Sequence, residues 1–289
     1  MRKETLEQFI YSTHTSKTAD SYLRSITKFT AQVPNAPEAQ YRDIVEYMVG
    51  IQKKYKDSAT PTRILAAIKR YYDYLQLMGE RNDHPCRRFT VKVNSNRTIR
   101  FGELFTPDEL ELMLNKEERY KVLKQRNIAV VSLLIYQGLT IDELVRLTVN
   151  DIDLDNATVY VKASKKNARR TLQMNSKQIL IFLKYIETRK ELIQRNSDKL
   201  LLSIRGVPIS GDGINSIVEG FKPLFTDRNL NPKTIRMSVI ANWLNVNKRP
   251  LDEVQLMAGH RWPSSTERYI RKDLTEQREL INKFHPLND

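Results

Sequence analysis

The chain has 289 residues, and its hydrophobic fraction of 40% can supply more than one core, since a domain commonly takes about 150 residues. It carries 48 Lys and Arg against 34 Asp and Glu, a formal net charge of +14, which favours nucleic acid over an anionic membrane as partner. The single cysteine, Cys86, excludes an intrachain disulfide and a cysteine-based zinc site. The N-terminus lacks a signal-peptide pattern and no run is apolar enough for a membrane span, so we expect a soluble, unprocessed, cytoplasmic protein without a membrane partner.

Helical spacing of apolar residues predicts short amphipathic helices in the first part of the chain. Three segments show this spacing: 18–30, 41–51 and 60–79. The polar face of the third segment carries Arg63, Lys69 and Arg70. A basic helical face is most often simply solvated, but this helix taken whole is a candidate for binding DNA phosphates.

Residues 85–104 lose the helical periodicity and are rich in arginine, including Arg97 and Arg100. This composition predicts an extended basic linker that also contacts DNA. We therefore expect an N-terminal helical domain, residues 1–84, that binds DNA, and a larger second domain, residues 105–289.

The second domain is predicted to be mainly α with one small antiparallel sheet. Val159 and Val161 alternate with polar residues, and the segment resumes an extended pattern at Thr171, so it indicates a β-hairpin with Lys165 and Lys166 at its tip. The run 129–136 is apolar almost all round, which is typical of a buried helix. Other helices are predicted from residues 106 and 126 onward and over 176–195, 214–225, 232–246 and 251–258.

Five separated side chains have complementary chemistry: Lys165, Lys233, Arg236, His260 and Tyr269. Each alone is more often a surface charge, an ion-pair partner or a packing residue. Together they could cleave a phosphodiester, because a tyrosine hydroxyl can attack phosphorus, cations can neutralise the phosphoryl oxygens, and a general acid can protonate the leaving oxygen. This chemistry needs neither a metal nor another cofactor.

The chain resembles the tyrosine recombinase or phage integrase family, in particular its Xer-like branch with an N-terminal core-binding domain. The motifs that carry the resemblance follow in the family's order over nearly the whole chain. They are YQGLTIDELVRLTVNDID from Tyr136, VKASKKNARRTLQM from Val161, KTIR from Lys233, LMAGH from Leu256 and STERYI from Ser265.

The resemblance implies a role for each matching residue. Tyr269 would be the nucleophile, Arg236 would clamp the scissile phosphate, and His260 would hydrogen-bond to it. Lys165 would be the general acid for the 5′ oxygen, with Lys166 as its first substitute.

Two positions depart from the family's pattern. Lys233 stands where the family usually has histidine, and Thr140 stands where its first motif has an arginine. Thr140 offers a hydroxyl and no charge, so either another arginine reaches the phosphate or the transition state is less stabilised. Arg146, six positions on, is the nearest replacement in sequence.

The resemblance implies a site-specific DNA recombinase that cuts and rejoins double-stranded DNA through a 3′-phosphotyrosyl link. It further implies paired recombination sites and a homo-tetramer on DNA, from a chain that is monomeric in solution. The C-terminal tail, with Leu274, Leu280, Ile281 and Phe284, would dock on a neighbouring protomer, or else pack on its own domain. Two alternatives remain open: a DNA-binding homologue with impaired or lost cleavage, and a type IB topoisomerase-like enzyme.

Overall fold

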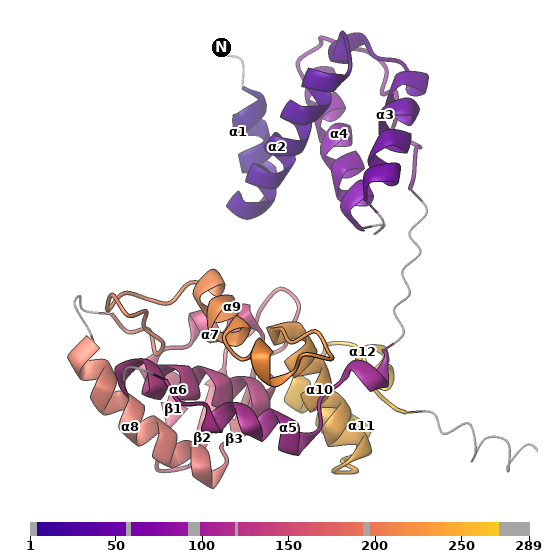
Figure 1. The fold of residues 1–289 in the computed structure, drawn as a ribbon. Helices are drawn as coiled ribbons and strands as arrows, with labels where there is room; N and C mark the ends of the chain where they lie inside the picture. The colour runs from indigo at the N-terminus through magenta and orange to yellow at the C-terminus, as the bar shows by residue number, and fades with distance from the viewer. Residues whose placement is uncertain (1–4, 56–58, 92–98, 119–120, 193–196, 272–289) are drawn as a thin grey trace, which may run out of the picture. The chain divides into compact units, whose positions relative to one another are not determined.

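A computed structural model describes residues 5–55, 59–91, 99–118, 121–192 and 197–271. The chain divides into two compact units, Met1–Arg97 and Thr98–Asp289. Both units are built mainly of helices and the described residues form one small sheet, which confirms the expected fold class (Figure 1). No helix among these residues is long and apolar enough to cross a membrane.

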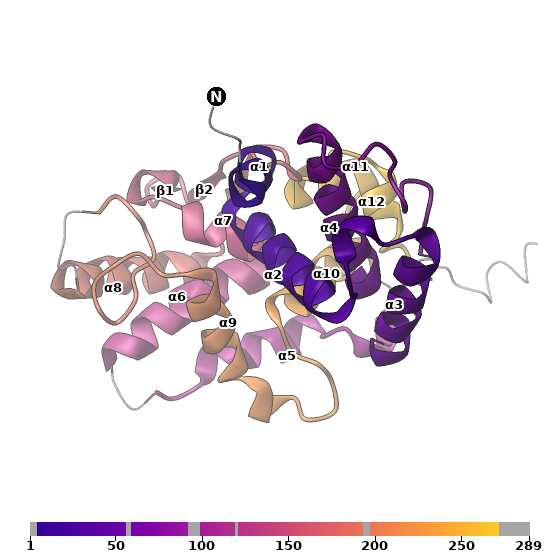
Figure 2. The ribbon, with the colours of Figure 1, turned by 90° about the horizontal axis from the view of Figure 1, so that it is seen from above.

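The N-terminal unit is a cluster of helices (Figure 2). Apolar residues from these helices share one core. Its α-helices are α1 (Leu6–Thr13), α2 (Ser16–Gln32), α3 (Tyr41–Lys54) and α4 (Ala59–Leu77). Phe29 of α2 and Tyr72 of α4 are fully buried, and the Tyr72 hydroxyl donates a hydrogen bond to the carbonyl of Ala36 at 2.8 Å. The predicted helices therefore form, whereas α1, which begins behind the cap residue Thr5, was not anticipated from its short pattern.

Both ends of the segment expected to be a linker are packed in the structure. Cys86 and Val91 belong to the N-terminal core, and Ile99 and Leu104 pack against Ala241 in the C-terminal unit. The reason is that apolar residues stand among the arginines and give each end something to bury. The segment between these ends, 92–98, lies outside the described residues.

The C-terminal unit is built around a helix whose second half is almost wholly apolar. Its α-helices are α5 (Pro107–Leu112), α6 (Lys121–Gln137), α7 (Ile141–Arg146), α8 (Ser176–Leu192), α9 (Gly211–Glu219), α10 (Pro232–Asn245), α11 (Leu251–Ala258) and α12 (Ser264–Glu267). Ala129, Leu133 and Leu134 of α6 have no exposed surface, and α6 packs against α8 and α10. The prediction of a buried helix over this run is confirmed.

One predicted helix is shorter than its pattern suggested. The apolar spacing extends to residue 225, but α9 ends before Gly220 and a short 3-10 turn, Lys222–Leu224, follows. Pro223 lies inside that turn, and proline lacks the N–H that a continuing α-helix would need.

The sheet contains β1 (Ile152–Asp153), β2 (Thr158–Val161) and β3 (Arg170–Gln173), all antiparallel in that order. Val159 pairs with Leu172 and Val161 with Arg170, and these four side chains are buried on one face. The predicted hairpin is confirmed, and its loop between Val161 and Arg170 carries Lys165 and Lys166.

The helices α11 and α12 lie at the opposite end of the unit from α8 (Figures 1 and 2). α11 ends at Gly259, whose φ of 72° is left-handed. A Cβ at this position would also lie 2.6 Å from Nη1 of Arg170, so glycine allows the close approach of strand β3. The reversal at Gly259 directs the chain through His260 into α12 and on to Tyr269.

Candidate active site

Tyr269 lies just after α12 with its backbone held on both sides. Its N–H donates to the carbonyl of Thr266 at 2.9 Å, and its own carbonyl accepts from Nδ2 of Asn245 at 2.8 Å. Burial raises the pKa of the Tyr269 hydroxyl, and the cations of Arg236 and Arg268 offset part of that increase. The side chain is therefore a neutral phenol at pH 7 that must lose its proton during nucleophilic attack.

His260 lies beside Tyr269, with ring centroids 6.2 Å apart and ring planes 20° from parallel. Its Nδ1 is 2.9 Å from Oγ1 of Thr266, a side chain that is fully buried. Burial, reinforced by the cations of Arg236 and Arg170, lowers the pKa of His260 to about 4. The imidazole is thus neutral at pH 7, so it can form a hydrogen bond with a phosphate without adding a charge.

Arg236 is directed inward from α10 and is held by backbone carbonyls. Nη1 donates to the carbonyl of Gly138, and Nη2 donates to the carbonyl of Ala258 at 2.6 Å. Nη1 is also 4.0 Å from Oε2 of Glu143. Burial lowers the pKa of Arg236, and Glu143 offsets part of that decrease; an arginine titrates so far above pH 7 that the guanidinium remains a cation. The structure therefore brings one cation, His260 and Tyr269 together from α10, the end of α11 and the end of α12.

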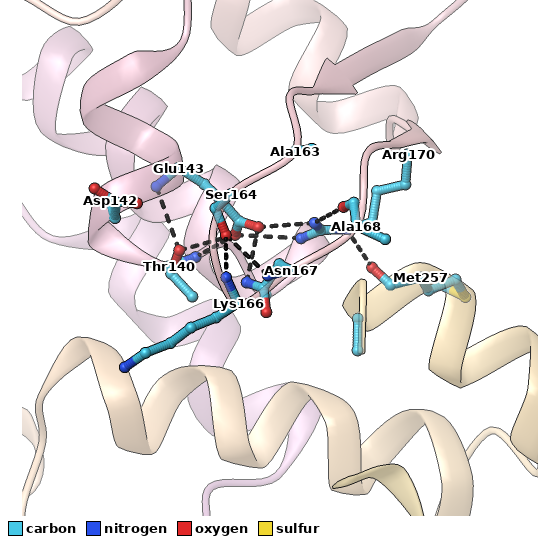
Figure 3. Close-up of polar contacts among 12 residues, drawn as sticks. Thr140, Asp142, Glu143, Ala163, Ser164, Lys166, Asn167, Ala168, Arg170 and Met257 are labelled. Carbon is cyan, nitrogen blue, oxygen red and sulfur yellow. Dashed lines mark hydrogen bonds and ion pairs between the residues drawn. The ribbon is translucent and has the colours of Figure 1, made fainter. Parts of the chain in front are cut away.

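Thr140 acts as the cap of a helix in this structure. Its Oγ1 accepts from the N–H of Glu143 at 3.3 Å and donates to Oε2 of Glu143 at 3.0 Å (Figure 3). Arg146 is engaged elsewhere, because Nη2 pairs with Asp142 at 2.8 Å and Nη1 donates to the carbonyl of Ala163 at 3.4 Å. These contacts hold the guanidinium of Arg146 against its own helix and the hairpin loop.

Arg170 is a buried cation that the sequence interpretation missed. Its Nη1 and Nη2 donate to the two oxygens of Glu143 at 2.7 and 3.2 Å, and its Nε donates to the carbonyl of Met257 at 2.7 Å. The Arg170 side chain is 1% exposed and that of Glu143 0%. The sequence offered two signals for this pair. An arginine stands at an inward position of β3 and an acid at an inward position of α7, and buried charges are nearly always paired.

The predicted lysines occupy different surroundings. Lys165 and Lys166 are exposed at the hairpin loop, and Figure 3 shows the Lys166 side chain extending away from the cluster around Glu143. Lys233 is exposed in the first turn of α10, one turn before Arg236. In the described part of the chain, no group of three His, Cys, Asp or Glu side chains could hold a metal ion.

Comparison with known proteins identifies the family. Residues 103–276 match the model described as the phage integrase family. The chain belongs to this family. It is a site-specific tyrosine recombinase, as the motifs and their order predicted.

Curated relatives of this recombinase span nearly the whole chain. It is 27% identical over 257 residues to the tyrosine recombinase XerC of Pelotomaculum thermopropionicum, covering 86% of this chain and 82% of the relative. It is 26% identical over 296 residues to the tyrosine recombinase XerD of Halalkalibacterium halodurans, covering 97% of each.

Solved structures agree on the fold of the recombinase. The integrase of transposon Tn1549, in complex with transposon right end DNA, gives a TM-score of 0.67 at 17% identity, covering 97% of this chain and 99% of that one. The XerH recombinase bound to palindromic difH substrate also gives 0.67, at 16% identity, covering 92% and 76%.

The N-terminal unit of the recombinase contains a groove of about 930 Å³ whose lining is net basic, with four basic residues against the acids Asp43 and Glu46. Arg63 lines it, and so do three basic residues that the sequence interpretation did not select, Arg24, Lys28 and Lys54. Other predicted DNA-binding residues make intramolecular contacts: Lys69 donates to the carbonyl of Arg87 at 2.9 Å, Arg70 pairs with Asp73 at 3.2 Å, and Arg100 pairs with Glu103 at 2.9 Å. Arg97 lies outside the described residues.

Proposed function

We propose that Tyr269 is the nucleophile of this recombinase and that Arg236 and His260 bind the scissile phosphate. The observation that carries the proposal is the convergence of these three side chains, since Tyr269 stacks beside His260 and Nη2 of Arg236 binds the carbonyl of Ala258, two residues before His260. Attack by the Tyr269 oxygen forms a 3′-phosphotyrosyl link and releases a 5′ hydroxyl, which can later reverse the step on a partner strand.

The charge that develops on the phosphoryl oxygens needs fixed donors. Arg236 supplies a guanidinium already oriented by the carbonyls of Gly138 and Ala258, and the neutral His260 adds one hydrogen bond. Lys233, exposed one turn away on α10, contributes a second positive charge at the position where the family usually has histidine. We assign no phosphate contact to Thr140 or Arg146, because their polar groups already bind Glu143, Asp142 and Ala163.

The departing 5′ oxygen needs a proton, and we propose that the Lys165 ammonium donates it. The lysine is exposed on a hairpin loop whose backbone meets the His260 turn, where the N–H of Ala168 donates to the carbonyl of Gly259 at 2.9 Å. An ammonium group there can approach a phosphate bound beside His260. Lys166, which extends away from the Glu143 cluster in Figure 3, is the substitute to test.

Binding to the DNA duplex would use both units. The basic groove around Arg63 offers phosphate contacts, and the arginine-rich segment with Arg97 and Arg100 adds more. Such contacts position the duplex without selecting its sequence.

We further propose that the chain is a monomer in solution and acts as a tetramer on two paired recombination sites. A groove of about 540 Å³ in the C-terminal unit is lined by Leu110, Trp243, Leu256 and Met257, and Leu256 is 66% exposed. The apolar residues of the tail of a neighbouring protomer, 272–289, could fill this groove; the tail itself lies outside the described residues.

A nicked suicide duplex tests the proposed function. The enzyme should become covalently attached to the 3′ end at the cleavage site, whereas a homologue that only binds would shift the duplex in a native gel and form no adduct. Plasmids with one or two sites test the paired-site requirement, because a topoisomerase-like enzyme would relax both equally and a recombinase would rearrange only the plasmid with two.

A further inference from the structure

The loop that carries Lys165 and Lys166 is a closed turn. The N–H of Ser164 donates to the carbonyl of Asn167 at 2.8 Å, and the N–H of Asn167 donates back to Oγ of Ser164, also at 2.8 Å. The N–H of Lys166 donates to the same Oγ at 3.2 Å. The backbone of the turn is therefore fixed, while both lysine side chains project from it into solvent.

The side chain of Asn167 ties this turn to the centre of the unit. Asn167 is only 9% exposed, and its Nδ2 donates to Oε1 of Glu143 at 3.0 Å (Figure 3). Glu143 cannot shift without breaking its ion pair with Arg170 and its bonds to Thr140. Glu143 thus provides a rigid acceptor, and Asn167 is the only residue of the described turn 164–167 whose side chain binds it.

The same turn is joined to the His260 segment. Asn167 lies opposite His260 in an isolated antiparallel bridge, and Nη2 of Arg261 donates to the carbonyl of Ser164 at 2.9 Å. Asn167 is thus the point at which the lysine turn, the Glu143 cluster and the His260 turn meet. A change in its side chain can alter the location of Lys165 without removing any group that binds phosphate.

We propose that Asn167 is a positioning residue for Lys165, holding the turn through Glu143 so that the Lys165 ammonium faces the 5′ oxygen. The inference rests on the proposed role of Lys165. In the step concerned, the Tyr269 hydroxyl loses its proton to solvent water and its oxygen forms a bond to phosphorus. The bond from phosphorus to the 5′ oxygen breaks, and a proton passes from Nζ of Lys165 to that oxygen. Asn167 takes no part in these bond changes.

A substrate with a 5′-bridging sulfur tests the inference, because a thiolate leaves without a proton. We expect Asn167→Ala to cleave the normal oxygen substrate roughly tenfold to a hundredfold more slowly, as a misplaced catalytic group does. On the sulfur substrate it should approach the wild-type rate. We define the ratio as the single-turnover rate on the sulfur substrate divided by the rate on the oxygen substrate. Measured in one preparation, this ratio does not depend on how much of the protein is folded.

A matched control is Asn156→Ala in the turn between β1 and β2, where Nδ2 donates to Oδ2 of Asp153 at 2.7 Å. This variant loses the same kind of bond at an exposed turn and should keep the wild-type ratio. Asn167→Ser, a milder change, should raise the ratio in the same direction as Asn167→Ala. Slow cleavage of both substrates by the two Asn167 variants, with DNA binding retained, would overturn the proposal.

Lys165→Ala separates failure of this inference from failure of the proposed acid. Sulfur rescue of Lys165→Ala without rescue of the Asn167 variants contradicts only the positioning role. An absence of rescue in Lys165→Ala contradicts the assignment of the acid and overturns the positioning role with it.

Discussion

Glu143 and Arg170 form an ion pair that is closed to solvent, with Nη1 2.7 Å from Oε1 and the two side chains 0% and 1% exposed. The pair links α7 to β3, and the Nε of Arg170 extends the link to α11 through Met257. Burial alone would raise the pKa of Glu143. The hydrogen bonds from Arg170 outweigh this effect and hold the pKa of the carboxyl at about 2. A buried charge that loses its partner is strongly destabilising.

The first prediction follows from this pairing. Arg170→Met should lower the free energy of unfolding of the C-terminal unit by about 3–5 kcal/mol, because it leaves Glu143 charged and buried. Urea unfolding followed by circular dichroism measures the change. The double variant Glu143→Leu/Arg170→Met should recover much of the loss, since it removes both charges; equal instability of single and double variants would contradict the pairing argument.

Thr140 gives a second prediction. Thr140→Ala should cost about 1 kcal/mol of stability through loss of the helix cap and change the cleavage rate little. Thr140→Arg loses the same cap but adds a guanidinium near Glu143 and Arg236, so single-turnover cleavage should rise by about tenfold or more. If Thr140→Arg leaves the cleavage rate unchanged while binding DNA normally, the position does not face the phosphate.

The third prediction concerns acid stability. The pKa of His260 is about 4 in the folded chain, below the value of about 6.5 for an unperturbed histidine. Between these values the unfolded chain binds a proton that the folded chain does not, so the free energy of unfolding falls as pH decreases from about 6.5 to 4. His260→Gln should flatten this part of the profile, and a variant profile equal to that of the wild-type protein would contradict the burial of a neutral His260.

Glu143 adds a separate loss at lower pH. Its pKa of about 2 lies below the ordinary value of 4.5, so its stabilising contribution is complete above pH 4.5 and disappears as pH falls toward 2. Glu143→Gln should reduce the loss of stability that occurs as pH falls from about 4.5 toward 2, which a comparison with the wild-type pH profile measures.

The fourth prediction distinguishes basic residues of the N-terminal unit. The logarithm of the DNA association constant should fall linearly with the logarithm of salt concentration, by roughly 0.9 per phosphate contacted. Arg63→Ala should reduce that slope by about one contact, because Arg63 lines the groove. Arg70→Ala should reduce it less, since Arg70 is engaged with Asp73. Fluorescence anisotropy at several salt concentrations gives both slopes. An association constant that does not change with salt would contradict DNA contact by this groove.

Much of the fold could be predicted from the sequence because its strongest elements obey simple periodicities. The apolar run of α6 and the alternation of β2 predicted buried structure, and burial of residues such as Leu133 and Val159 confirms both. Two features were harder to predict. The helix α1 is short, and the end of α9 depends on Gly220 and Pro223 and not on the apolar periodicity.

The site could be predicted only where a side chain has its own chemistry. Tyr269, His260 and Arg236 were selected because their roles are complementary, and the structure brings these three together. Arg170 and Asn167 were missed because their importance comes from contacts with Glu143, which is distant in sequence. Such partners become apparent only once β3 and α7 are packed together.

The measurement that tests the proposed mechanism most directly is peptide mapping of the residue joined to DNA after reaction with a nicked suicide substrate. The DNA should be attached to Tyr269 in the wild-type protein. Tyr269→Phe removes one oxygen and keeps the ring, so DNA binding should persist while the covalent adduct disappears, and Tyr160→Phe, at an exposed strand position, should behave as wild type. An adduct that persists in Tyr269→Phe, or that maps to another side chain, would contradict the mechanism.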